Sequence, residues 1–292
     1  MLSRIRCLLL ICGLVVPLTV RSQGVSTSVI DEALGRPGQK TGDVYKVGFP
    51  RTDLHVVVHG LAIKPGLALG SWAAFLGTDD HAVVMGDLVL LEDEVNPVID
   101  RLRRSGFEIT AIHNHLIDET PHLLYMHYMG HGAAGPLAAS LKEALSVSKT
   151  PLGKPAPSAE ESTLPSWVNT LEDSVGRKGN FKGGVLSYGV ARSDQITSDG
   201  ITVAPAAGVA EAINFQAADA GQVATTGDFV LTSSEVNPVL SELRARGIAV
   251  TALHSHMLTE QPRLFFMHFW AVGDPQSVGA GIKAALSHIS VK

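Results

Sequence analysis

The 292-residue sequence is poor in several residue types, and each scarcity narrows what the protein can be. It has two cysteines, Cys7 and Cys12, and both lie in an apolar stretch near the N-terminus. If that stretch is cleaved off, no thiol remains to form a disulfide or to bind a metal as thiolate. Any metal site in the mature chain must then use nitrogen and oxygen ligands.

Motifs of several common enzyme classes are also missing. The sequence has no H-E-x-x-H zinc motif, phosphate-binding loop or dinucleotide-binding glycine fingerprint, and no Ser-His-Asp order typical of serine hydrolases. Serine acyl transfer, nucleotide hydrolysis and hydride transfer therefore have no support. After the N-terminal stretch, no apolar run is long enough to span a membrane.

The N-terminus has the pattern of a cleaved secretion signal. Arg4 and Arg6 precede an apolar segment, residues 7–20, and Ser22 is the small residue expected just before a cut. Cleavage would remove three of the 23 basic residues and no acid, leaving 20 against 28 and a formal net charge of −8. An uncleaved anchor is the alternative. We expect a periplasmic or secreted protein whose acidic surface disfavours nucleic acid and anionic membranes as partners.

The chain is a tandem repeat. The segment 86–128 matches 227–269 without a gap at a constant offset of 141 residues, and about half of the positions are identical. A stretch rich in proline, serine and charge separates the copies and is typical of a linker. The predicted organisation is a signal peptide (1–22), a first repeat (23–147), a linker (148–167) and a second repeat (168–292).

Each repeat is expected to alternate strands and helices in the order β-α-β-β-α. This order predicts the α+β class, as two tandem ferredoxin-like (split β-α-β) units with extra strands, packed as a pseudo-dimer. In the first repeat the expected elements are a strand at 83–91, a helix from Glu92 to Gly106, strands at 107–116 and 123–128, a final helix at 138–147, and added strands within 45–75. In the second repeat, residues 224–232 correspond to the first of these strands and residues 277–289 to the final helix.

A repeated pattern of histidines indicates metal binding. Residues two apart on a strand point to one face, and a hairpin would bring a third histidine of the next strand within reach. Three imidazoles around one point suit a tetrahedral divalent metal with one position left open. We expect zinc, with copper as the alternative. The predicted ligands are His113, His115 and His127 in the first repeat and His254, His256 and His268 in the second.

Two pairs of repeated glutamates are candidate partners for such a metal. Glu94 and Glu235 lie in identical EVNP segments, and Glu119 and Glu260 follow the histidine pairs. Each can be a fourth ligand, a group that orients an imidazole, or a general base. For Glu94 and Glu235 the competing interpretation is helix-start chemistry, because acids are stabilising in a first helical turn.

The repeated string T-A-[IL]-H-x-H, followed by E-x-P and [LF]-x-M-H-[YF], resembles the LppY/LpqO-type family of exported bacterial proteins. The likeness covers nearly all of the chain after the signal and includes the duplication. It implies an exported protein of a domain class without an established activity. Members are often lipid-anchored, whereas Ile11 before Cys12 is a poor lipidation signal.

Three hypotheses follow. The first is an exported envelope protein that binds a divalent transition metal through a His-x-His…His site in each repeat. The second is a zinc-dependent hydrolase that uses metal-activated water, with Glu119 or Glu94 as base. The third is a structural or ligand-binding envelope protein without a metal, whose histidines form a hydrogen-bonded network. Besides the metal ion, an unknown small molecule is a further expected partner.

Overall fold

The computed structural model describes residues 24–154 and 163–292. The expected signal peptide, and residues 155–162 of the expected linker, lie outside these ranges. Within them, no helix is both long and apolar enough to cross a membrane.

Each repeat folds into a six-stranded antiparallel sheet with helices, so the mixed class of helices and strands and the tandem repeat are confirmed. The strand orders are β1-β2-β5-β6-β9-β7 and β10-β11-β14-β15-β17-β16. The strands of the first sheet are β1 (Gln39–Thr41), β2 (Val44–Pro50), β5 (Gly70–Gly77), β6 (Ala82–Leu91), β7 (Glu108–His113) and β9 (Leu123–Gly132). Those of the second are β10 (Asn180–Lys182), β11 (Val185–Ala191), β14 (Ala210–Ala217), β15 (Val223–Thr232), β16 (Ala249–His254) and β17 (Leu264–Gly273).

The strand order within each repeat explains why the sequence pattern predicts a split β-α-β unit. Strand β9 lies between β6 and β7 and is antiparallel to both. Strands β5, β2 and β1 extend the sheet beyond β6, as expected for the region 45–75. In the described part of the first repeat no strand follows the last helix, so the sheet is completed by strands that precede β6.

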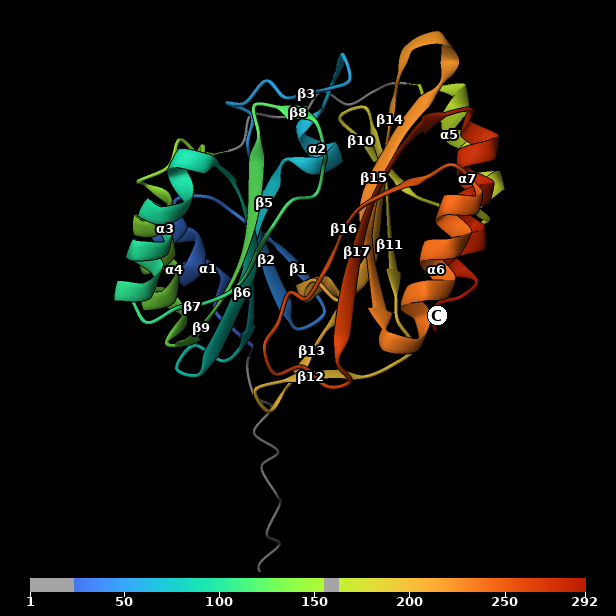
Figure 1. Ribbon diagram of the computed structural model, residues 1–292. Coiled ribbons are helices and arrows are strands. Elements are labelled where there is room, and N and C mark those ends of the chain that lie inside the picture. Colours follow the sequence, from blue (N-terminus) through green and yellow to red (C-terminus); the bar gives the residue numbers. More distant parts are fainter. Residues whose placement is uncertain (1–23, 155–162) are drawn as a thin grey trace, which may run out of the picture.

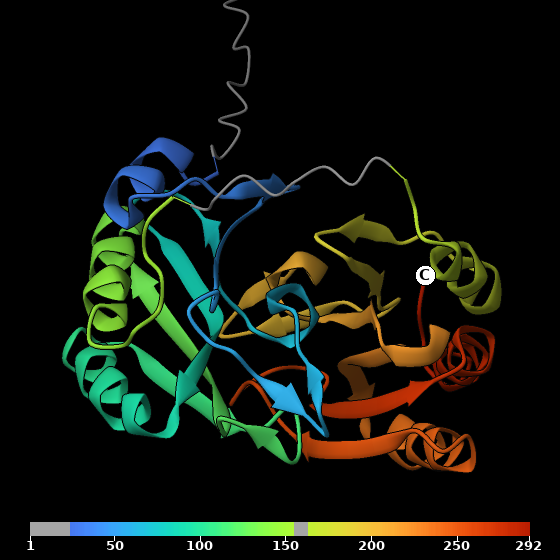
Figure 2. The same cartoon turned by 90° about the horizontal axis from the view of Figure 1, so that it is seen from above.

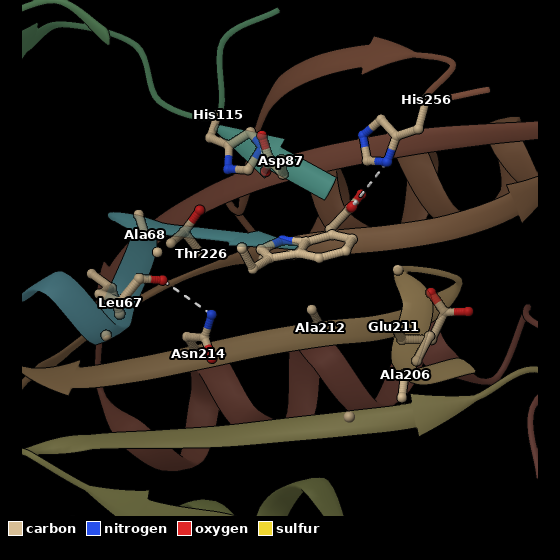
Figure 3. A pocket seen from close by; sticks show the side chains of 18 of the residues that line it. Leu67, Ala68, Asp87, His115, Ala206, Glu211, Ala212, Asn214, Thr226 and His256 are labelled. Carbon is tan, nitrogen blue, oxygen red and sulfur yellow. Dashed lines mark hydrogen bonds and ion pairs between the residues drawn. The ribbon is translucent and has the colours of Figure 1, made fainter. Parts of the chain in front are cut away.

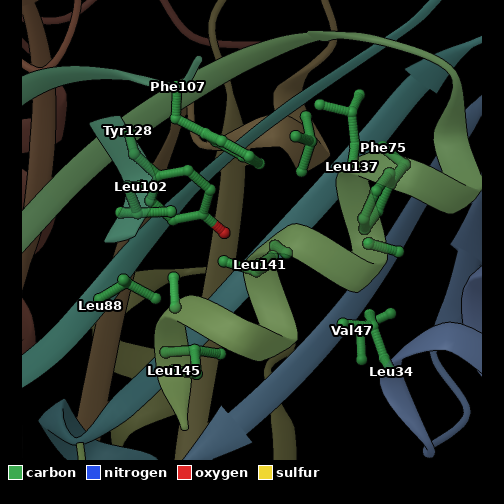
Figure 4. Close-up of a cluster of buried hydrophobic side chains, with 14 of the residues drawn as sticks. Leu34, Val47, Phe75, Leu88, Leu102, Phe107, Tyr128, Leu137, Leu141 and Leu145 are labelled. Atoms are coloured by element: carbon green, nitrogen blue, oxygen red, sulfur yellow. The ribbon is translucent and has the colours of Figure 1, made fainter. Parts of the chain in front are cut away.

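Three helices cover the outer face of each sheet (Figures 1 and 2). They are α1 (Thr27–Leu34), α3 (Glu92–Arg104) and α4 (Ala134–Leu145) in the first repeat, and α5 (Ser166–Val175), α6 (Ser233–Ala245) and α7 (Pro275–Leu286) in the second. Leucines 137, 141 and 145 recur at helical spacing and turn one face of α4 toward the sheet, where they pack with Phe75 and Phe107 (Figure 4). Burying this apolar stripe fixes each helix layer on its sheet.

The two sheets face each other through their uncovered sides, which gives four layers in the order helix, sheet, sheet, helix (Figure 1). Two apolar clusters fill the space between the sheets, and both take residues from the two repeats. One includes Met85 and Met129 with Phe266 and Met257. The inner faces are therefore an internal interface rather than two solvent-exposed surfaces.

Two connections cross this interface in opposite directions. The β2–β5 connection carries β3 (Val57–Val58), β4 (Leu61–Ala62) and α2 (Pro65–Ala68), and Asn214 Nδ2 donates to Leu67 O at 3.0 Å. The β11–β14 connection carries β12 (Ile196–Ser198), β13 (Ile201–Val203) and η1 (Pro205–Ala207), and η1 contacts β2 and β5. The remaining short elements are β8 (Glu119–Thr120), which pairs with β3, and η2 (Asp219–Gly221). Residues of both connections line the space between the sheets.

Candidate metal centre

The histidines of each repeat lie on the inner face of its sheet. In the β7–β9 pairing, His113 stands opposite Tyr125, and His127 stands opposite Ala111. Strand β7 ends at His113, so His115 lies just beyond the strand that was expected to reach residue 116. The second repeat has the same arrangement, with His254 as the last residue of β16.

The structure brings the two histidine triads together in one cluster. Three pairs of rings contact each other across the interface. His113 and His254 stack at a centroid distance of 3.7 Å, as do His127 and His256 at 3.6 Å, and His115 and His268 meet at 3.8 Å with their rings tilted. Two groups have ligand atoms that all lie within 4.8 Å of one another. One group is His113, His115 and His127, and the other is His113, His254, His256 and His268. His113 belongs to both groups, so the two triads form a single centre.

Two aspartates that were not predicted complete the cluster. Asp87 pairs with His127 in the β6–β9 register, and Asp228 pairs with His268 in the β15–β17 register. Asp87 oxygens lie 3.7 Å from His115 Nε2 and 3.8 Å from His127 Nε2. Asp228 oxygens lie 3.9 Å from His256 Nδ1 and 3.8 Å from His268 Nδ1. The Gly-Asp pair at the start of each repeated segment was the sequence feature that could have indicated these aspartates.

Burial makes these groups unstable as isolated charges. It lowers the pKa of His113 to about 4 and of His254 to about 3, and it holds the pKa of the other four imidazoles well below the ordinary value. Burial also raises the pKa of Asp87 to about 8. Neutral imidazoles are the form that binds metal ions.

The donor atoms of the cluster fit a metal, because many of them have no partner in the protein. Among the described residues, buried atoms without a hydrogen bond include one oxygen each of Asp87 and Asp228 and one nitrogen each of His113, His115, His127, His254 and His268. Each unsatisfied buried polar group costs about 1–3 kcal/mol. Two nitrogens on one tetrahedral zinc lie about 3.4 Å apart, so the grouped donor atoms would have to approach one another by up to about 1.4 Å to share an ion.

The first pair of predicted glutamates lies outside this cluster. Glu94 accepts hydrogen bonds from Arg51 Nη1 at 2.7 Å and from the backbone N–H of Leu91 and Lys149. Glu235 has the same role with Arg192. In both repeats the glutamate ties the start of a helix to a buried arginine, which agrees with the helix-start interpretation.

The second pair also bonds to neighbouring groups of its own loop, although the other oxygen of Glu119, Oε2, is buried without a partner among the described residues. Glu119 accepts from the backbone N–H of Leu123 at 3.1 Å and lies 3.0 Å from His122 Nδ1. Glu260 accepts from Leu264 N–H at 3.0 Å and pairs with Arg263 at 3.3 Å. The structure therefore places neither pair of glutamates in the histidine cluster.

A cavity of about 370 Å³ opens onto the cluster from between the sheets. His115, His256 and Asp87 lie along one side of it, and Ala212 and Asn214 of β14 lie on the other (Figure 3). Cavities of this size accommodate small organic molecules. A small molecule can thus reach the donor atoms of the candidate centre.

Comparison with known proteins gives a family but no activity. No curated protein matches the chain. Among solved structures, the crystal structure of EtuB from Clostridium kluyveri is similar at 11% sequence identity, over 86% of this chain and 90% of that chain, with a TM-score of 0.19. Nothing about this chain follows from so poor a superposition. The family model described as Domain of Unknown Function (DUF1259) matches residues 28–147 and 169–288, which together are most of the sequence, and the chain therefore belongs to that family.

Proposed function

We propose that this protein binds a divalent transition metal in one centre that both repeats build together. The observation that carries the proposal is the set of buried, unpartnered imidazole nitrogens and aspartate oxygens gathered at the interface. Histidine and carboxylate donors suit zinc, with copper as the alternative. The eight side chains can serve two four-coordinate ions or one ion of higher coordination.

Elemental analysis by plasma mass spectrometry tests this proposal directly. Full-length protein is purified without a polyhistidine tag, beside a His113→Ala/His254→Ala variant. We expect one or two equivalents of a single transition metal in the natural protein and a loss of metal in the variant. Absence of metal from both, even after reloading with zinc, copper or manganese, would sink the proposal and leave a non-metal structural or ligand-binding role.

We also propose that the protein acts in the cell envelope after export. The basic and apolar pattern of residues 1–22 and the resemblance to LppY/LpqO-type proteins support this. N-terminal sequencing of protein from the periplasmic or culture fraction should begin at Gln23. A mature chain that retains Met1 in the cytoplasm would contradict export.

A second candidate function is metal-dependent hydrolysis, and the cavity beside the cluster favours it. A metal bound there would supply Lewis acidity and acidify a water molecule. Asp87 and Asp228 line the cavity, and a metal bound there would favour their ionised forms, which can accept a proton; Glu94 is bonded to Arg51, and Glu119 is held through Oε1 by Leu123 N–H and His122 in its own loop. The test is a screen of metal-loaded protein against ester, amide and phosphoester substrates, with Asp228→Asn beside Glu119→Gln. Activity lost in Glu119→Gln but kept in Asp228→Asn would return the role of base to Glu119.

A further inference from the structure

The cavity beside the cluster is asymmetric, although the cluster itself is nearly symmetric between the repeats. Trp72 stands beside Asp87 in the β5–β6 register, and Ala212 stands beside Asp228 in the matching β14–β15 register. The bulky indole therefore fills in the first repeat a space that remains open in the second. Trp72 also packs against Gly208, where an added Cβ would come within 2.8 Å of the ring. The space beside the cluster is therefore open on the side of the second repeat.

A lysine supplies the asymmetric cavity with a positive charge. Lys46 Nζ lies 3.8 Å from the centroid of the Trp72 ring and 3.5 Å from Ala206 O. Among the described residues, no carboxylate oxygen lies within 4.0 Å of this ammonium group. The repeat offset places Ser187 at the corresponding position of the second repeat. The amine of Lys46 thus faces the cavity; burial lowers its pKa to about 8, and the nearby Asp87 favours its charged form.

The rest of the lining combines apolar surface with neutral hydrogen-bonding groups. Leu67, Ala68 and Ala212 offer apolar contact, and Asn214 and Thr226 are neutral polar side chains (Figure 3). Glu211 also lines the cavity, but its carboxyl accepts from Val230 N–H at 2.6 Å and lies 4.0 Å from Arg192 Nη1, which offsets its charge toward a bound anion. The lining matches a molecule with an apolar body and one anionic group.

We propose that the cavity binds one small organic carboxylate, whose anionic group pairs with Lys46 and whose apolar body lies against Trp72 and Ala212. This inference rests on the proposed function, since the candidate metal centre lines the same cavity as Lys46. A bound carboxylate gains a charge-assisted hydrogen bond in a largely buried site. A neutral molecule of the same shape gains only the apolar contacts.

Calorimetric titration with matched probes tests this inference on metal-loaded, full-length protein. Benzoate and benzamide have nearly the same shape and differ in charge. We expect benzoate to bind about tenfold more tightly or better, because hydrogen bonds between charged groups are stronger than neutral ones. Lys46→Met should abolish this preference, whereas Lys182→Met, which removes an exposed lysine of β10, should keep it.

A second variant tests the location of the site independently of Lys46. Ala212→Trp places in the second repeat the residue that the first repeat already has, and the indole would occupy the cavity. We expect benzoate affinity to fall by about tenfold or more while metal content stays unchanged. Equal binding of benzoate and benzamide, no binding of either, or full binding by Ala212→Trp would overturn this inference while metal content remains intact. Absence of metal from the natural protein would instead overturn the proposed function.

Discussion

Replacing Glu94 by glutamine tests whether this glutamate stabilises the fold or serves chemistry at the cluster. Its carboxylate accepts from Arg51 Nη1 at 2.7 Å and Nη2 at 3.2 Å, and from Lys149 N–H at 2.8 Å. The guanidinium of Arg51 is fully buried. The amide of glutamine would turn a donor toward the Arg51 donors and remove the negative charge.

The magnitude follows from the burial of this ion pair. Loss of one partner of a buried pair costs about 3–5 kcal/mol, and because Asp53 still contacts Arg51 we expect about 3 kcal/mol. For a chain of this size that lowers the melting temperature by roughly 6–12 °C. Glu92→Gln, in the same helical turn but exposed, is the control and should change stability by less than about 0.5 kcal/mol.

Thermal and urea unfolding followed by circular dichroism measure the effect, with metal content determined on the same samples. Burial alone would raise the pKa of Glu94, but the hydrogen bonds from Arg51, Lys149 and Leu91 outweigh it and lower that pKa. The stabilisation by Glu94 is therefore full at neutral pH and is lost as the pH falls through its folded pKa. If Glu94→Gln is as stable as the natural protein but has lost its metal or activity, the structural role is refuted.

Two further predictions concern packing and protonation. Gly86→Ala should lower the free energy of unfolding by about 1–3 kcal/mol, because its Cβ would lie 2.2 Å from Trp72 O. Gly48→Ala has open space around the new Cβ and should lower it less. Urea unfolding of both variants measures the difference, and equal losses would contradict the close packing beside Asp87. In metal-free protein the folded imidazoles bind fewer protons than the unfolded chain, so the free energy of unfolding should fall as the pH drops from 7 to 5. The raised pKa values of Asp87, Asp228 and Glu211 oppose this, but these three carboxyls are outnumbered by six imidazoles. A stability that rises toward pH 5 in urea titrations would show that the imidazoles are not buried.

The sequence was sufficient for the class, the duplication and the identity of six candidate ligands. Period-two and helical spacing predict strands and helices well where one face is buried, which is why α3 and β6 lie close to their expected positions. The shared cluster was not predictable, because no local pattern encodes how two sheets pack face to face. His113 and His254 are 141 residues apart and meet only through that packing.

The aspartates were missed for a related reason. Asp87 lies in a strand that is otherwise apolar, and its pairing with His127 depends on the β6–β9 register. The role of Lys46 depends on the difference between Trp72 and Ala212 across the repeats, which matters only once both sheets line one cavity. The register between distant strands and the packing of the two sheets therefore could not be predicted from the sequence.

The metal content of His113→Ala tests the shared centre most directly. His113 is common to both groups of ligands, so we expect this single substitution to reduce the metal per chain to less than half of the natural amount. His131→Ala, which removes a half-exposed histidine of the same repeat outside the cluster, should keep full metal. Two independent sites, one in each repeat, would instead leave at least half of the metal in His113→Ala, and that result would contradict the account.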